Sequence, residues 1–203
     1  MKRITEKESL ELISQMIQQS KKNMEVGSRN ILLYYGYPAV VLAVVVYVLA
    51  HTSHNYVWFA LWFLMFVPSV LIRLAERKSK PRIITHVDKA INSIWCILGW
   101  LFFLSVVGIF AIGSIVGSCN FALMMPLSLL YAGIGMSITG VITDFKLMVY
   151  TPLVAFSASI YMLVSLVAGI PFADWWNLLF GAAFLIMMII PGHLLNHKAK
   201  ESC

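Results

Sequence analysis

Two pairs of histidines are the residues of this chain whose spacing could hold a metal ion. His193 and His197 are four residues apart, so both fall on one helical face, and this spacing can bind zinc. No third His is nearby, and Pro191 and Gly192 are expected to disturb the local helix, which disfavours a complete ligand set. His51 and His54 belong to a turn that we expect on the opposite side of a membrane, so the two pairs cannot combine. The pattern favours ordinary histidines at helix ends, and we assign no metal site.

Three serines in one apolar segment, Ser157, Ser159 and Ser165, are the candidate nucleophiles. They lack a partner base in the sequence and are expected to bond to carbonyls of their own helix. Away from the ends of the predicted spans, where Arg73 and His193 fall, no Asp, Glu, Lys, Arg or His is present; such groups inside a membrane mark proton relays and intramembrane active sites. The sequence therefore predicts no catalytic residue, no cofactor and no enzymatic activity, and it disfavours a proton-coupled transporter.

A glycine-rich stretch holds small residues at helical spacing, with Gly133 four residues from Ser137 and Gly135 four residues from Thr139. Small residues let helices approach closely, and Ser or Thr then bonds across the contact, so we predict a helix-packing face. A hinge or broken helix beside a binding cavity is the alternative, because Pro126 lies in the same segment. The stretch is not a nucleotide-binding fingerprint, since no strand precedes it.

Three charged residues remain near the ends of apolar segments. Asp144 and Lys146 share one short turn and are expected to pair weakly, as exposed ions do. Asp174 precedes two tryptophans, Trp175 and Trp176, and is expected to cap a helix start. The tryptophans themselves are typical of residues at a membrane–water interface.

The composition requires a membrane to position these residues. Of the 203 residues, 60% are hydrophobic and 12% charged, against roughly 45–50% and about 25% in soluble domains. The net charge of +6 would suggest nucleic acid for a soluble protein, but here the basic residues border apolar blocks. Anionic lipid headgroups are the expected counter-charge, and no nucleic-acid partner is predicted. The three cysteines, Cys96, Cys119 and Cys203, indicate no disulfide framework.

The predicted fold is an all-α membrane protein with six transmembrane helices. Each apolar segment has about the 20 residues that a helix needs to cross a bilayer. The segments span about residues 31–50, 56–74, 90–112, 120–143, 147–168 and 176–195. Residues 31–197 then form one six-helix transmembrane domain, preceded by a cytosolic segment at 1–30 and followed by a short cytosolic tail at 198–203.

The placement of the basic residues predicts the topology. Of the fifteen Lys and Arg, six fall in residues 1–30, six in Arg73–Lys89, one between the fourth and fifth segments and two in the tail. The three opposite turns hold none. Because short loops rich in Lys and Arg stay in the cytoplasm, we expect both termini there.

Residues 1–30 are expected to form an amphipathic cytosolic helix from about Glu6 to Val26. Thr5 and Glu8 match a capping box, and apolar residues recur at helical spacing from Leu10 to Met24. The pattern is not that of a cleavable signal peptide. The helix either lies at the membrane interface or against the bundle, or it is a short coiled-coil or partner-binding arm.

Four stretches together carry a resemblance: Glu8–Ile17, Ile31–Tyr37, Leu130–Lys146 and Ile189–Leu195. On these the chain resembles a family of small, uncharacterised six-helix bacterial inner-membrane proteins. The resemblance implies a multi-pass protein of the bacterial cytoplasmic (inner) membrane with a stand-alone fold. It supplies no catalytic residue.

Polar residues are concentrated on the expected cytosolic face. The leading hypothesis is a non-enzymatic scaffold or regulatory partner that binds through the N-terminal arm and the Arg73–Lys89 loop, with a protein partner or a homo-oligomer left open. The alternative is a small permease or channel for a neutral or apolar solute, for which aromatic, Ser and Thr side chains could line a path.

Overall fold

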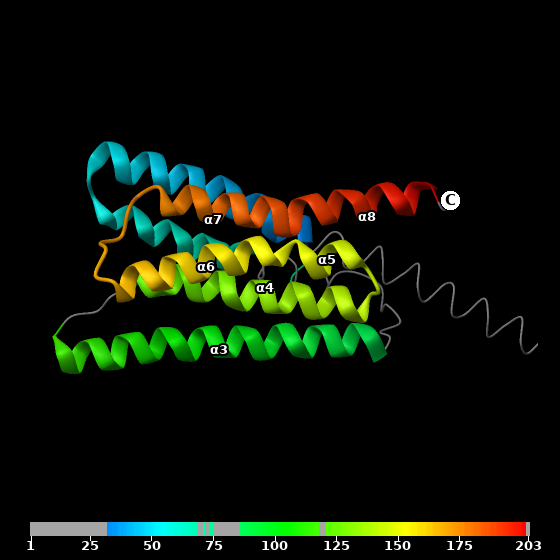
Figure 1. Ribbon diagram of the computed structural model, residues 1–203, viewed down its shortest axis with the longest axis horizontal. Coiled ribbons are helices and arrows are strands. Elements are labelled where there is room, and N and C mark those ends of the chain that lie inside the picture. The colour runs from blue at the N-terminus through cyan, green and yellow to red at the C-terminus, as the bar shows by residue number, and fades with distance from the viewer. Residues whose placement is uncertain (1–31, 69–70, 72–73, 75–85, 118–120, 202–203) are drawn as a thin grey trace, which may run out of the picture.

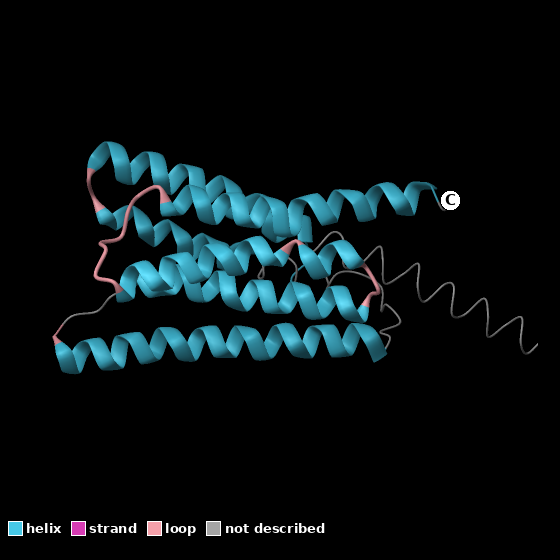
Figure 2. Ribbon diagram, viewed as in Figure 1, coloured by secondary structure: helices cyan, strands magenta, loops and turns pink. Residues whose placement is uncertain are grey.

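Every regular element in the part of the chain that the structure describes is a helix (Figure 2). The structure is a computed structural model that describes residues 32–68, 71, 74, 86–117 and 121–201. The all-α class is therefore confirmed for these residues. The predicted helix within 1–30, most of the Arg73–Lys89 loop, Cys119 and Cys203 lie outside them.

The elements follow one another along the chain as long helices joined by short turns. They are the Leu32–Ser53 helix, η1 (Tyr56–Met65), α3 (His86–Val116), η2 (Phe121–Leu123), α4 (Met124–Ile142), α5 (Lys146–Tyr150), α6 (Pro152–Val167), α7 (Trp176–Phe184), η3 (Leu185–Ile189) and α8 (Ile190–Glu201). Among the described residues, five helices are long and apolar enough to cross a membrane: Leu32–Ser53, Val87–Val116, Phe121–Ile142, Lys146–Val167 and Trp176–Leu195.

Several predicted boundaries were wrong by a turn of helix. α3 begins at His86 rather than at residue 90, so the last four residues of the Arg73–Lys89 loop form its first turn. Asp88 lies in that turn, where a negative charge favours the helix dipole. α3 also continues to Val116, and the expected turn at 113–118 starts only at Gly117, whose φ is +79°.

The last two predicted spans are not uniform helices. Pro152 is the first residue of α6 and separates it from α5, because proline lacks the N–H that would continue the preceding helix. The final helix runs without a break through α7, η3 and α8, and η3 is a π-helical turn. The segment 198–203, predicted as a tail, is helical as far as Glu201.

The second predicted span starts as a ten-residue 3-10 helix, η1, which is long for this type. A 3-10 helix has three residues per turn, so residues three apart lie on one face. Phe59, Trp62 and Met65 follow this spacing and are half-buried, while Val57, Phe63 and Leu64 are exposed. Residues three apart in η1 therefore face the bundle together, with Leu61 half-buried beside them.

α4 lies at the centre of the bundle, between α3 and α6 (Figure 1). α6 in turn packs on α7, and the Leu32–Ser53 helix runs beside α7. At one end of the bundle lie residues 54–55, the end of α3 and the connection 168–175; we call this the hairpin end. The start of α3, the α4–α5 turn and α8 lie toward the other end, which we call the charged end because it carries Lys89 and Lys146.

The glycines of α4 permit its close contacts, as the helix-packing prediction required. A methyl group placed on Gly133 would lie 2.6 Å from the Phe156 ring of α6, and one on Gly135 would lie 2.9 Å from Leu98 of α3. At Gly140 the obstacle is the backbone of α5, with the carbonyl carbon of Met148 at 2.8 Å. Backbone cannot move aside as a side chain can, so Gly140 is the least replaceable of the three.

We predict that Gly140→Ala lowers the free energy of unfolding by about 1–3 kcal/mol, the usual cost of overpacking. Unfolding in mixed micelles titrated with a denaturing detergent measures this change. Gly108→Ala in α3 is the matched control, because nothing lies within 4 Å of its added methyl group. The control should change stability by less than about 1 kcal/mol; equal losses for both variants would contradict the packing argument.

Candidate functional site

The Leu32–Ser53 helix turns a stripe of small residues toward the C-terminal helix formed by α7, η3 and α8. The buried positions alternate in steps of four and three residues, the spacing of a helix seam. They are Leu32, Gly36, Ala39, Ala43, Val46 and Ala50, and Leu42 is buried beside them. We call this contact the small-residue seam. In membranes such stripes let two helices approach closely and gain van der Waals contact.

Glycines on both helices form the tightest points of the small-residue seam. A methyl group added to Gly181 would lie 2.8 Å from Cβ of Ala43, and one added to Gly36 would lie 2.8 Å from Cγ1 of Ile189. Gly192 faces Leu33 in the same way, at 2.9 Å. The residue numbers at these contacts increase along the first helix as they decrease along the C-terminal helix, so the two helices are antiparallel.

The π turn η3 lies inside the small-residue seam. The eight positions from Gly36 to Ala43 face the nine from Gly181 to Ile189, and η3 spans Leu185–Ile189. A π turn takes more residues per turn than an α-helix, so it accommodates the additional residue and keeps the seam in register. Single π turns are frequent at functional positions of helices.

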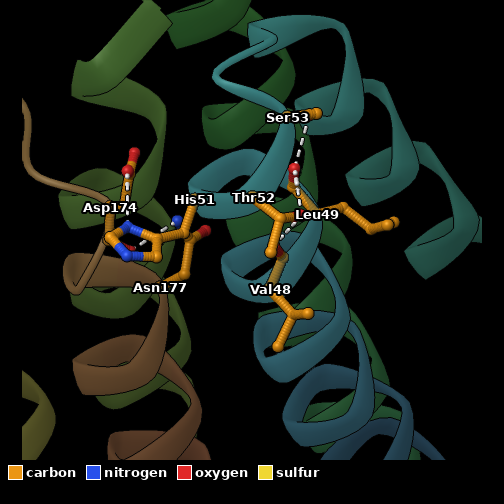
Figure 3. A network of polar contacts seen from close by, with 7 residues as sticks. All are labelled: Val48, Leu49, His51, Thr52, Ser53, Asp174 and Asn177. Carbon is orange, nitrogen blue, oxygen red and sulfur yellow. Dashed lines mark hydrogen bonds and ion pairs between the residues drawn. The ribbon is translucent and has the colours of Figure 1, made fainter.

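A polar cluster closes the small-residue seam at the hairpin end (Figure 3). Nδ1 of His51 lies 3.6 Å from Oδ2 of Asp174, a contact that becomes an ion pair when His51 is protonated. The side-chain amide of Asn177 donates to the backbone carbonyl of Asp174 at 3.0 Å. Nε1 of Trp62 in η1 donates to Oδ1 of Asn177 at 3.3 Å. The cluster thus ties three segments together around Asn177, whose exposed fraction is 0%.

A second polar pair lies toward the charged end of the small-residue seam. The Tyr37 hydroxyl and Nε2 of His193 are 2.5 Å apart, and the two rings meet edge to face with centroids 6.0 Å apart. His193 therefore has a tyrosine partner from the opposite helix. Within the described ranges, no group of three His, Cys, Asp or Glu comes together as a metal site would require.

The predicted site residues of α6 behave in three different ways. Ser157 donates to the Leu153 carbonyl of its own helix at 2.9 Å, as predicted. For Ser159 the prediction was wrong, because its hydroxyl donates to the Pro126 carbonyl of α4 at 2.7 Å. Ser165 is buried and makes no such bond within the described part of the chain.

Thr139 of the glycine-rich stretch makes the interhelical bond that its type and spacing predicted. Its Oγ1 accepts from Nε1 of Trp95 in α3 at 3.2 Å and donates to the Gly135 carbonyl at 2.6 Å. Small residues and a hydroxyl thus act together on one face of α4, which favours helix packing over the hinge alternative.

Three expectations about charged residues and tryptophans were wrong. Asp174 does not cap α7, which starts after Trp175 without a side-chain cap; its carboxylate faces His51 instead. Asp144 and Lys146 are exposed and do not approach within the 4 Å of an ion pair. Trp176 is not an interface residue, since only 1% of it is exposed, whereas Trp175 is 44% exposed.

The small-residue seam and Asn177 were missed in the sequence, although a signal was there. The alternation of Gly36, Ala39, Ala43 and Ala50 is visible once the spacing of small rather than large residues is followed. Asn177 lies in the first turn of an apolar segment, where an amide reads as a cap and not as a buried bridge.

Comparison of the chain with protein-family models, with curated proteins and with solved structures gives no match.

We predict that Gly181→Ala destabilises the bundle by about 1–3 kcal/mol, because the new methyl group meets Ala43. Adding Ala43→Gly to the same chain removes the obstacle. The double variant should therefore be more stable than the sum of the two single effects by at least about 0.5 kcal/mol. Detergent unfolding of the four proteins measures the coupling; strictly additive effects would show that these positions do not touch.

We also predict that Trp62→Phe costs about 1 kcal/mol more than Trp58→Phe. Both variants lose an indole N–H, but only Trp62→Phe leaves a buried acceptor, Oδ1 of Asn177, without its donor. Trp58 donates at 2.8 Å to Ser53 on the exposed surface, where water replaces the bond. The same unfolding assay compares the two, and a larger loss for Trp58→Phe would argue against the bridge.

Proposed function

We propose that this chain is a six-span protein of a bacterial cytoplasmic (inner) membrane, with both termini in the cytoplasm. In this proposal it acts as a non-enzymatic scaffold or regulatory partner through its cytosolic face. The bacterial location rests on the resemblance described above. Membrane lipids with anionic headgroups, and a protein partner or further copies of the chain, are its proposed contacts.

Five of the six proposed spans correspond to the five long apolar helices, and the remaining one is the second along the chain, the segment that starts with η1. A 3-10 helix rises about 2.0 Å per residue, so the ten residues of η1 cover about 20 Å. Residues 66–68, Leu71 and Leu74 are also helical, which extends the segment further. Its start lies at the hairpin end, next to Ser53, and its course toward the charged end supports a complete crossing (Figure 1).

The single observation that carries the topology and the function is the distribution of charge between the two ends. The Lys residues that the structure describes lie toward the charged end, and in the sequence the other Lys and Arg precede the Leu32–Ser53 helix or fall between η1 and α3. The connections at the hairpin end hold none. Cations kept on one side of the bilayer indicate the cytoplasmic side. A surface of this charge suits anionic lipid headgroups and acidic protein segments.

The interior of the described bundle supports a scaffold because its buried polar side chains, Ser165 excepted, have hydrogen-bond partners within the protein. Besides Trp62 with Asn177 and Trp95 with Thr139, Ser105 of α3 and Tyr131 of α4 lie 2.8 Å apart. These bonds join helices and leave a stable platform that presents the cytosolic segments.

A small permease or channel for a neutral or apolar solute is the second candidate. The 3-10 helix η1 and the π turn η3 favour it, because broken or irregular helices border the binding sites of many transporters. Two hollows on the described bundle give it less support. One is lined by α6 and Ile170, the other by residues 144–147 and Leu194, so neither lies along the small-residue seam.

We predict that removing residues 1–28 reduces recovery of partner proteins by at least about tenfold, because the proposed contact surface is lost. Chemical cross-linking in intact cells, followed by purification and quantitative mass spectrometry, measures the recovery. The matched control replaces Lys198 and Lys200 by Gln in the full chain, which lowers the charge and leaves the N-terminal arm in place. An unchanged set of partners after the deletion would rule out the scaffold role assigned to this arm.

A further inference from the structure

A groove runs along α6 near the hairpin end, apart from the small-residue seam. Its volume is about 490 Å³, within the roughly 300–1,000 Å³ of small-molecule sites. Apolar side chains form most of its wall, among them Ile160, Val164 and Ile170. No Asp, Glu, Lys, Arg or His lines it, so a charged ligand group has no counter-charge there.

Ser165 lies in the wall of this groove and has an unused hydroxyl. Only 4% of the residue is exposed, and no hydrogen bond to its hydroxyl is found among the residues that the structure describes. The other two serines of α6 differ, because Ser157 and Ser159 both donate to backbone carbonyls. A buried hydroxyl without a partner is costly, most of all where the surroundings are hydrocarbon. Ser165 therefore offers a buried and unused hydrogen-bond donor in a mostly apolar wall, whereas the other unbonded hydroxyl of the wall belongs to Tyr161, a residue that is 48% exposed.

The level of Ser165 in the membrane indicates which hydrogen-bond acceptor its hydroxyl would meet. The span that contains it runs from Lys146 to Val167, and Ser165 is two residues from its end, which is about 3 Å along the helix. In a bilayer this level is where acyl chains join the headgroup region. Trp175 marks the same level, since it is exposed and its ring lies 5.8 Å from that of Tyr161 in the groove wall. Ester carbonyls of glycerolipids lie there.

We propose that the groove binds one ester-linked lipid of the outer leaflet. The acyl chain lies along Ile160 and Val164, and the ester carbonyl accepts a hydrogen bond from Oγ of Ser165. This inference rests on the membrane placement proposed above but not on the scaffold role. It is separate from the binding of anionic headgroups at the charged end, because the groove recognises the ester and the chain and not the headgroup charge.

The experiment compares two phosphatidylcholines that differ only in linkage, one with ester-linked and one with ether-linked chains. Native mass spectrometry of the purified full chain, titrated with each lipid in detergent, gives the affinities. We expect the wild-type protein to bind the ester lipid about fivefold more tightly, the worth of one hydrogen bond. Ser165→Ala should abolish this preference. Ser157→Ala is the matched control and should keep it, because Ser157 lines the same groove but already bonds to Leu153.

Three outcomes would overturn the proposal. The first is equal binding of the two lipids by the wild-type protein, and the second is loss of the preference in Ser157→Ala. The third is a lipid-free dimer that Ser165→Ala dissociates, which would show a second copy in the groove. Detergent unfolding without lipid gives an independent check: Ser165→Ala should be at least as stable as wild type, and a clear loss would show that the hydroxyl has a partner within the chain.

Discussion

The apolar surroundings of the helices are the constraint on which the rest of this structure depends. Hydrocarbon offers neither hydrogen bonds nor counter-charges, so a buried polar group that lacks a partner is costly. Trp95 and Thr139 illustrate how closely this requirement is linked to packing. The indole ring lies against Gly135, one turn from Thr139, and its N–H reaches the threonine hydroxyl because no side chain intervenes. The close approach at Gly135 and the hydrogen bond to Thr139 thus belong to the same contact between α3 and α4.

The same constraint explains the small-residue seam. Lipid chains are as apolar as leucine, so two helices in a membrane gain little from burying large side chains and more from close backbone approach. Gly181 against Ala43 provides that approach in the middle of the seam. The polar contacts are confined to its two ends, where His51 meets Asp174 and His193 meets Tyr37.

The sequence predicts the helical class and most of the apolar segments, because uncharged runs of about 20 residues have few alternatives. It predicts the ends of helices less well. α3 extends past both predicted limits, since a helix does not stop where its residues become polar. Long-range pairing was harder still. Ser159 could satisfy its hydroxyl locally or across to Pro126, and only the packing of α6 on α4 decides between them. Asn177 was missed for the same reason: its partner Trp62 is 115 positions away.

Confinement of Lys and Arg to one side of the bundle is the central claim, and labelling from outside the cell tests it most directly. Single cysteines replace Asn55 at the hairpin end or Lys146 at the charged end, in a chain whose Cys96, Cys119 and Cys203 are changed to Ser. A membrane-impermeant maleimide is then added to intact cells. The account predicts that the cysteine at position 55 is labelled and that the one at 146 reacts only after the cells are opened. Labelling of position 146 in intact cells would contradict it.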